Sequence, residues 1–303
     1  MDRRIKVTEL SGGVGGARLA RGLAALHEVD LTVVVNVGDD MTMHGLQISP
    51  DIDTVVYTLA GVEGPMGWGR AGDTFTFNEE IARFGLDNVF RLGDRDLALK
   101  LFRTALMGEG VPLSEITKRV VDSFDVGADV LPATDDAVPT RVRLADGWVG
   151  FHEYFVKRGH RDEVLELEFR NVHAATPAPG VVAAIEEADV LIVGPSNPLL
   201  SIAPILAIEG VREVVAGHPH RLAVSPLIGG AAVKGPADKV MISLGYRPGN
   251  QGVADFYLGL VDLLVIHSAD ADAPVVGVRT LATETLIEEK SAALRLAREL
   301  VMI

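Results

Sequence analysis

Residues 5–16 read Ile-Lys-Val-Thr-Glu-Leu-Ser-Gly-Gly-Val-Gly-Gly, an apolar strand that runs directly into a glycine loop. Three further apolar runs, at 31–35, 190–193 and 222–224, also end in loops of small and polar residues. In an open parallel sheet, loops of this kind share the carboxyl edge, where such folds bind their ligands. The pattern therefore predicts a nucleotide site at that edge.

Strands and helices alternate along most of the chain, as in a parallel sheet with right-handed crossovers. Helices are expected from 17 to 26, from Thr54 onward and from 284 to 301. We therefore predict an α/β fold: a Rossmann-like parallel sheet with helices on both faces.

Residues 85–175 depart from this alternation and are interpreted as a helical and antiparallel insertion. Two amphipathic helices are expected there, followed by short strands. The chain has no internal repeat or linker, so residues 1–303 are interpreted as one domain. The expected elements of the insertion are helices at 94–107 and 113–124 and strands at 140–144, 148–155 and 164–169.

Composition excludes several classes of protein. The 303 residues include no Cys, which rules out disulfides, thiolate metal sites and a Cys nucleophile. The formal net charge of −14 opposes non-specific binding to nucleic acid. No apolar stretch approaches the roughly 20 residues that span a bilayer. We predict a cytoplasmic protein without nucleic-acid or membrane partners, and a homodimer.

The glycine loop contributes Gly12, Gly13, Gly15 and Gly16 as candidate nucleotide-binding residues. Glycines let backbone approach a phosphate, and the first amides of the following helix attract negative charge. The spacing departs from the dinucleotide fingerprint because Arg18 stands where Gly or Ala is required, and no Gly-Lys-Ser/Thr follows. The alternative is that these glycines only make a tight turn.

Four aspartates, Asp39, Asp40, Asp51 and Asp53, fall within fifteen residues after the second strand. Carboxylates gathered beside a phosphate loop repel one another unless a cation lies between them, and Mg²⁺ uses one or two carboxylates with phosphate oxygens. We predict Mg²⁺ bound by Asp39 and Asp53, which are also the predicted catalytic residues. The alternative is that Asp53 caps the helix from Thr54 and the others are solvated.

Three further loops carry candidate binding groups. Arg91 opens the segment Arg91-Leu-Gly-Asp-Arg-Asp and is free for a ligand anion or for ion pairs with neighbouring aspartates. Ser196 and Asn197 follow the strand at 190–193, and Ser225 follows the strand at 222–224. Each loop alone would be an ordinary turn between a strand and a helix.

Taken together, these segments resemble the CofD/FbiA family, the transferases that make the deazaflavin coenzyme F-420. Each motif is weak, but the ordered set is specific and covers most of the chain, roughly from Val7 to His267. The motifs are Ser11-Gly-Gly-Val-Gly-Gly-Ala, Asn36-Val-Gly-Asp-Asp, Ser49-Pro-Asp-Ile-Asp-Thr, Leu92-Gly-Asp-Arg-Asp, Leu131-Pro-Ala-Thr-Asp-Asp, Gly194-Pro-Ser-Asn-Pro and Ser225-Pro-Leu-Ile-Gly-Gly.

The resemblance implies that the hydroxyl of the deazaflavin Fo attacks a guanosine diphosphate ester of phospholactate or phosphoenolpyruvate, releasing GMP. By this similarity Asp53 and Arg91 match positions that bind Fo, and the region around Asp39 and Asp53 matches the Mg²⁺ site. The glycine loop, Ser196, Asn197 and Ser225 match the part that holds the guanosine diphosphate. The sequence leaves the identity of the transferred acid and of the general base open.

Two other functions are alternatives to the transferase. One is a non-catalytic regulator of the YvcK type that binds a nucleotide or nucleotide sugar. It is disfavoured because such relatives are not expected to combine Ser49-Pro-Asp-Ile-Asp-Thr with Leu92-Gly-Asp-Arg-Asp. The other is a nicotinamide-dependent oxidoreductase, which the altered glycine spacing disfavours.

Overall fold

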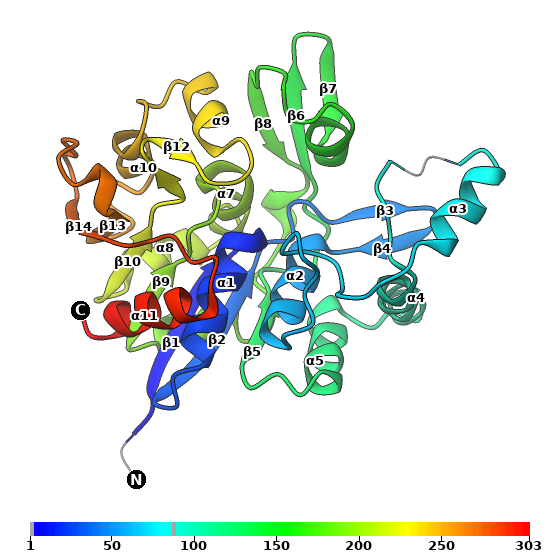
Figure 1. The fold of residues 1–303 in the computed structure, drawn as a ribbon, viewed down its shortest axis with the longest axis horizontal. Coiled ribbons are helices and arrows are strands. Elements are labelled where there is room, and N and C mark those ends of the chain that lie inside the picture. Colours follow the sequence, from blue (N-terminus) through cyan, green and yellow to red (C-terminus); the bar gives the residue numbers. More distant parts are fainter. Residues whose placement is uncertain (1–2, 87–88) are drawn as a thin grey trace.

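A seven-stranded parallel sheet forms the centre of the protein (Figure 1), in a computed structural model that describes residues 3–86 and 89–303. All six pairs of neighbouring strands are parallel. The fold class predicted from the sequence is confirmed. In spatial order the strands are β14 Arg279–Thr283, β13 Leu263–His267, β10 Arg221–Val224, β9 Val190–Val193, β1 Ile5–Ser11, β2 Val29–Val35 and β5 Asp129–Pro132.

The order of the strands reverses between β1 and β9. From β1 the chain proceeds outward to β2 and β5, whereas β9, β10, β13 and β14 extend the sheet on the other side. Such a reversal opens a crevice at the carboxyl ends of the two central strands, and open α/β sheets bind ligands there. The glycine loop after β1 and the Gly194 loop after β9 flank this point.

Helices cover both faces of the sheet, and each face has its own apolar core. Strand β9 is buried on both sides: Ile192 packs into one core and Leu191 into the other. Near-continuous apolar runs are typical of such central strands. One layer contains α1 Gly13–Ala24, α2 Pro50–Leu59, α5 Leu113–Ser123 and α11 Lys290–Val301; the other contains α6 Val181–Glu186, α7 Ala203–Leu206, α8 Val211–Gly217, α9 Ala237–Ser243 and α10 Asn250–Phe256.

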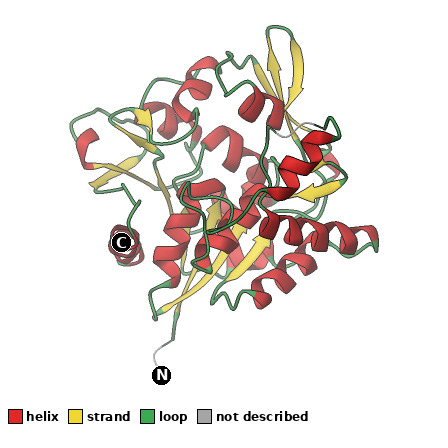
Figure 2. Ribbon diagram, turned by 45° about the vertical axis from the view of Figure 1, so that its right-hand side comes forward, coloured by secondary structure: helices red, strands yellow, loops and turns green. Residues whose placement is uncertain are grey.

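The remaining elements lie around the carboxyl edge, and Figures 1 and 2 show two extensions beyond the sheet. One is a three-stranded antiparallel sheet in the order β7–β6–β8, and the other combines α3, α4 and the β3–β4 hairpin. Their bounds are β3 Met41–Met43, β4 Leu46–Ile48, α3 Thr76–Arg83, α4 Asp94–Gly108, β6 Thr140–Leu144, β7 Gly147–Gly150 and β8 Glu166–Phe169; short pieces are β11 Leu227–Ile228, β12 Ala231–Ala232, the π-helices Glu153–Lys157 and Pro198–Ile202, and the 3₁₀ turns Val172–Ala174 and Ser268–Asp270.

Several predicted boundaries are wrong. The strand expected over 148–155 ends at Gly150, and a π-helix follows. Strand β5 belongs to the parallel sheet, although it falls inside the range expected for the insertion. The last helix begins at Lys290, and the edge strand β14 precedes it. None of the helices in the described chain combines the length and apolarity needed to cross a membrane.

Candidate functional site at the carboxyl edge of the sheet

Reciprocal hydrogen bonds join the loops after β1 and β9. The Gly12 N–H donates to Ser196 Oγ at 3.0 Å, and the Ser196 hydroxyl donates back to the Gly12 carbonyl at 2.7 Å. Asn197 Oδ1 caps the next turn by accepting from the amides of Leu199 and Leu200. The side chains of Ser196 and Asn197 therefore hold the two loops in place.

The glycines of the loop are required by close packing. A Cβ atom on Gly15 would lie 2.2 Å from the Pro195 carbonyl oxygen, and one on Gly16 would lie 2.1 Å from Ser11 Oγ. Gly13 has φ +65, which favours glycine. Helix α1 accordingly begins at Gly13, earlier than the expected Ala17, and the glycines form its first turn.

Ser225, on the next loop along the edge, is also held internally. Its hydroxyl donates to Asn250 Oδ1 at 2.6 Å, and its Oγ accepts from the Leu227 amide at 3.2 Å. Both Ser225 and Asn250 are buried. The side chain of Ser225 therefore orders the turn.

The aspartates after β2 divide into two groups, which are described in turn below. Helix α2, which carries two of them, begins at Pro50 and not at the predicted Thr54. Proline fits the first helical position, where its missing N–H costs nothing. Asp51 and Asp53 therefore both lie in the first turn of α2. The alternative role for Asp53 as the cap of this helix is excluded, since residue 49 occupies the cap position.

Asp39 and Asp51 form the first group, bridged by the buried amide of Asn36. Asn36 Nδ2 donates to Asp51 Oδ2 at 3.0 Å and lies 3.4 Å from Asp39 Oδ1. The Gly38 amide fixes Asn36 by donating to its Oδ1 at 2.8 Å. Asp51 also accepts a hydrogen bond from the Gly13 amide, which joins the acidic cluster to the glycine loop.

Among residues 3–86 and 89–303, no cation neutralises this first group. Burial and the neighbouring Asp51 charge raise the pKa of Asp39 well above its usual value. Burial also raises the pKa of Asp51 to about 6 and that of Asp40 well above its ordinary range. Asp40 Oδ2 accepts from the Ser49 hydroxyl at 2.7 Å, but its buried Oδ1 has no partner.

Oxygen donors gathered in this way suit a hard divalent cation such as Mg²⁺. Across residues 3–86 and 89–303, no group of three or more His, Asp or Glu side chains is arranged to hold a metal by itself. A metal here would therefore share two carboxylates with oxygens of a bound ligand, as Mg²⁺ does at phosphate sites. The donor set fits that chemistry.

Asp53 belongs to a separate, fully buried ion-pair network. Lys100 Nζ lies 2.5 Å from Asp53 Oδ2, and the Arg103 guanidinium contacts both carboxylate oxygens. Lys100 also pairs with Asp96 at 2.6 Å, and the Tyr57 hydroxyl donates to Asp96 at 2.7 Å. Burial raises the pKa of Asp53, but the charges of Arg103 and Lys100 outweigh it, so the pKa lies below its usual value.

Sequence reasoning missed Lys100 and Arg103, both on α4. One sequence signal indicates an ion pair there, because Asp96 and Lys100 are spaced i, i+4 on a helix with many apolar residues. The pairing with Asp53 could not be read from the chain, since it spans about fifty residues. Asp53 is thus ionised by contact with protein cations, whereas in the described part of the chain Asp39 and Asp51 contact no cation.

Arg91 lies on the exposed segment before α4, and its guanidinium carbon is 4.1 Å from the centroid of the Phe75 ring. A cation over an aromatic face is attracted by the ring quadrupole. No contact joins Arg91 to Asp53 in the part of the chain that the structure describes. The two predicted Fo-binding residues therefore belong to different elements, the α3–α4 segment and α2.

Two aspartates cap α3 and α4 reciprocally, which fixes the segment that carries Arg91. Asp94, at the start of α4, accepts from the amides of Thr76 and Phe77 at the start of α3. Asp73, before α3, accepts from the amides of Arg95 and Asp96. Each helix start is therefore held by an aspartate outside that helix.

Asp94 makes the stability of this pair pH-dependent. The Thr74 hydroxyl and the Phe77 amide lower the pKa of Asp94 to about 2, below its ordinary value. Stability from this carboxylate is full above the unfolded pKa, near 4, and is lost as the pH falls through about 2. The difference in unfolding free energy between the parent and Asp94→Asn should be constant above pH 4 and shrink towards pH 2. Urea titrations across that range would measure it, and a constant difference would contradict it.

The fold and the residues at this edge define the class of protein. It is a Rossmann-like α/β protein that has a glycine loop and the carboxylate pair Asp39 and Asp51 where the order of the strands reverses. Comparison with known proteins gives the family. The family described as 2-phospho-L-lactate transferase CofD matches residues 7–296, and the chain belongs to it. It is accordingly a member of a transferase family, as the resemblance of its motifs implied.

Individual relatives agree with this assignment. The chain is 42% identical over 296 residues to the phosphoenolpyruvate transferase of Thermobifida fusca, covering 92% of this chain and 91% of the relative. It is 40% identical over 304 residues to the 2-phospho-L-lactate transferase of Methanopyrus kandleri, covering 99% and 97%. Among solved structures, protein BH3568 from Bacillus halodurans superposes with a TM-score of 0.69, covering 99% of this chain and 100% of that chain, at 19% identity. That last likeness shows the fold alone.

Proposed function

We propose that this transferase acts in coenzyme F-420 biosynthesis and joins a phosphorylated three-carbon acid to the deazaflavin Fo. The terminal ribityl hydroxyl of Fo attacks the phosphorus that bears the acid in a guanosine diphosphate ester. A new P–O bond forms, the bond to GMP breaks, and the hydroxyl proton passes to solvent or a nearby base. The observation that carries the proposal is the uncompensated Asp39 and Asp51 pair, which hydrogen bonds connect to the glycine loop.

Transfer of this kind depends mostly on positioning and on neutralising charge. We propose that Asp39 and Asp51 hold Mg²⁺, which would supply Lewis-acid stabilisation of the diphosphate oxygens when bound. Asp51 replaces Asp53 in this assignment, because Lys100 and Arg103 already engage both oxygens of Asp53. The backbones of the glycine loop, of Ser196 and Asn197, and of Ser225 remain the proposed contacts for the guanosine diphosphate.

Asp53 remains a proposed contact for Fo, with an orienting role. Its Oδ1 accepts a hydrogen bond from Arg103, and a carboxylate oxygen can accept a second one from a substrate hydroxyl. The cations beside it hold its pKa low, which makes it a poor proton acceptor but a good hydrogen-bond acceptor. We therefore propose that Asp53 aligns the attacking hydroxyl.

The test is a reaction of purified protein with Fo, Mg²⁺ and each synthetic guanosine diphosphate ester, followed by mass spectrometry. We expect stoichiometric GMP and a phosphodiester of Fo, and the better donor identifies the acid. Binding of a nucleotide sugar with no turnover of Fo would instead support the regulator that shares this fold. The predicted homodimer is checked on the same preparation by multi-angle light scattering, where a monomer would refute it.

Arg91 is proposed to contact the acceptor and not the donor. Arg91→Ala should weaken Fo binding by about tenfold, the scale of about 1.4 kcal/mol expected for a lost cation contact, and leave GDP affinity within a factor of two. Fo fluorescence and GDP calorimetry measure the two constants. Arg95→Ala, four residues on and also exposed, is the matched control. A larger loss of GDP affinity than of Fo affinity would overturn this assignment.

A further inference from the structure

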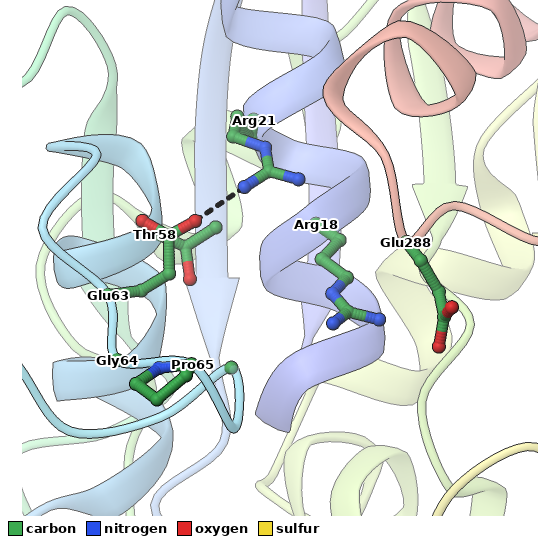
Figure 3. A pocket seen from close by; sticks show the side chains of 8 residues that line it. Arg18, Arg21, Thr58, Glu63, Gly64, Pro65 and Glu288 are labelled. Carbon is green, nitrogen blue, oxygen red and sulfur yellow. Dashed lines mark hydrogen bonds and ion pairs between the residues drawn. The ribbon is translucent and has the colours of Figure 1, made fainter. Parts of the chain in front are cut away.

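A cavity lies beside α1, outside the cluster of loops already described. It has a volume of about 250 Å³ and lies between α1, the segment after α2 and the segment before α11 (Figure 3). Gly67 packs against Val14 of α1, which holds the glycine-rich segment over this side of the helix. Its lining residues are Arg18, Arg21, Thr58, Glu63, Gly64, Pro65, Gly67 and Glu288.

The cations at this cavity are not all neutralised. Arg21 pairs with Glu63 at 2.6 Å, and both side chains are largely buried. Arg18 has no carboxylate within ion-pair distance among residues 3–86 and 89–303, although Figure 3 shows Glu288 on the same side of the cavity. Arg18 is only half-buried, so its guanidinium keeps its donors available to the cavity.

Lys234 adds a second available cation. Its Nζ donates to the Met66 carbonyl at 3.1 Å, which places the ammonium at the loop that borders the cavity. Burial lowers the pKa of Lys234, the Arg18 charge lowers it further, and Glu288 partly offsets both. The two cations are therefore near enough to repel each other, and no carboxylate pairs with either in the described chain.

The lining of the cavity balances two cations, Arg18 and Arg21, against two carboxylates, Glu63 and Glu288. Lys234 is not part of this lining but borders it through the Met66 carbonyl, and it adds a third positive charge beside a chain whose net charge is −14. Glu288 offsets the repulsion between Arg18 and Lys234 only in part, and like charges held together are destabilising unless a ligand compensates them. An anion that accepts hydrogen bonds from both would relieve this repulsion.

We propose that this cavity is a second anion site, in which Arg18 and Lys234 bind a small phosphate group. Arginine and lysine are the side chains that bind phosphate in proteins, the first through a fork of donors and the second as a point charge. The volume of about 250 Å³ lies below the range of about 300–1,000 Å³ that is typical of pockets for drug-sized ligands, which suits a phosphate or a phosphorylated small acid. This inference does not depend on the identity of the reaction.

The test is calorimetry of the full-length protein with inorganic phosphate at constant ionic strength, in buffer free of other multivalent anions. We expect saturable binding at one site. Arg18→Gln and Lys234→Gln should each weaken it at least tenfold. Arg212→Gln, at an exposed arginine in the first turn of α8, removes the same charge elsewhere and should leave the affinity unchanged.

Each outcome decides the proposal. An equal loss of affinity in Arg212→Gln would mean that phosphate responds only to net charge. An unchanged affinity in Arg18→Gln would place the phosphate at the glycine loop. Either result overturns the assignment, and so does the absence of phosphate binding by the parent protein. Lys234 lies on an exposed loop, so its variant remains informative if Arg18→Gln perturbs α1. A titration with phosphoglycolate, which adds a carboxylate, gives a second affinity to compare with that of inorganic phosphate. The ligand that binds more tightly shows whether the site prefers a free phosphate or a phosphorylated acid.

Discussion

Asp53→Ala is expected to lower the free energy of unfolding by about 3–5 kcal/mol, the cost of leaving a buried charge without its partner. Arg103 is 1% exposed and Lys100 is 2% exposed, so neither can turn to water when the carboxylate is removed. Lys100 keeps Asp96, whereas Arg103 loses both of its carboxylate contacts. Urea unfolding followed by circular dichroism measures the change.

Two controls separate this effect from a general loss of charge. Glu115→Ala breaks the exposed pair with Arg119 and should cost less than about 1 kcal/mol. The double variant Asp53→Ala/Arg103→Met removes the orphaned cation as well and should recover part of the lost stability. A single variant as stable as the parent would show that the network does not hold α4 against α2.

Asp39→Asn is expected to reduce kcat/KM at least about 100-fold, or about 2.7 kcal/mol of transition-state stabilisation, if Asp39 binds the catalytic Mg²⁺. The amide keeps the shape of the side chain but removes the charge that a divalent cation needs. Initial rates measured against Mg²⁺ concentration should show a higher half-saturating concentration as well as a lower maximum. Asp122→Asn, at an exposed aspartate of α5, is the control and should behave like the parent.

The same Asp39→Asn variant should not lose stability. Desolvation and the Asp51 charge raise the pKa of Asp39, so its ionised form is a cost to the folded state in the absence of a cation. A less active but equally or more stable protein is the expected combination, because sites of charge repulsion trade stability for function. Near-normal turnover at low Mg²⁺ would refute the metal assignment.

The sequence was sufficient where local pattern decides structure. The runs that became β1, β2, β9 and β10 are rich in Val, Leu and Ile, as is typical of buried parallel strands, and their loops carry the expected glycines and polar residues. Strand β14 is exposed along most of its length, so it has no apolar run to detect. The turn at Ser49 and Pro50 was legible as a helix start, since proline favours the first turn, but the aspartates drew the prediction four residues too far.

The site was only partly predictable because two kinds of carboxylate look alike in a sequence. Asp51 and Asp53 are two residues apart on one helix turn, yet one faces the glycine loop and the other faces α4. Only the tertiary position of Lys100 and Arg103 decides which aspartate is neutralised by the protein. The hydrogen bonds of Ser196 and Ser225 to loop backbone and to a buried amide were likewise not visible in the sequence, which predicts only that both residues contact a ligand.

The mutual hydrogen bonds of Ser196 and Gly12 have a consequence for how the two halves of the molecule can move. They join the loops after β1 and β9, where the order of the strands reverses, so the half built on β1 and the half built on β9 are fastened together there. Pulling them apart would strand a buried hydroxyl and a buried amide, at about 1–3 kcal/mol for each orphaned group. Separation of the two halves at the crevice is therefore disfavoured.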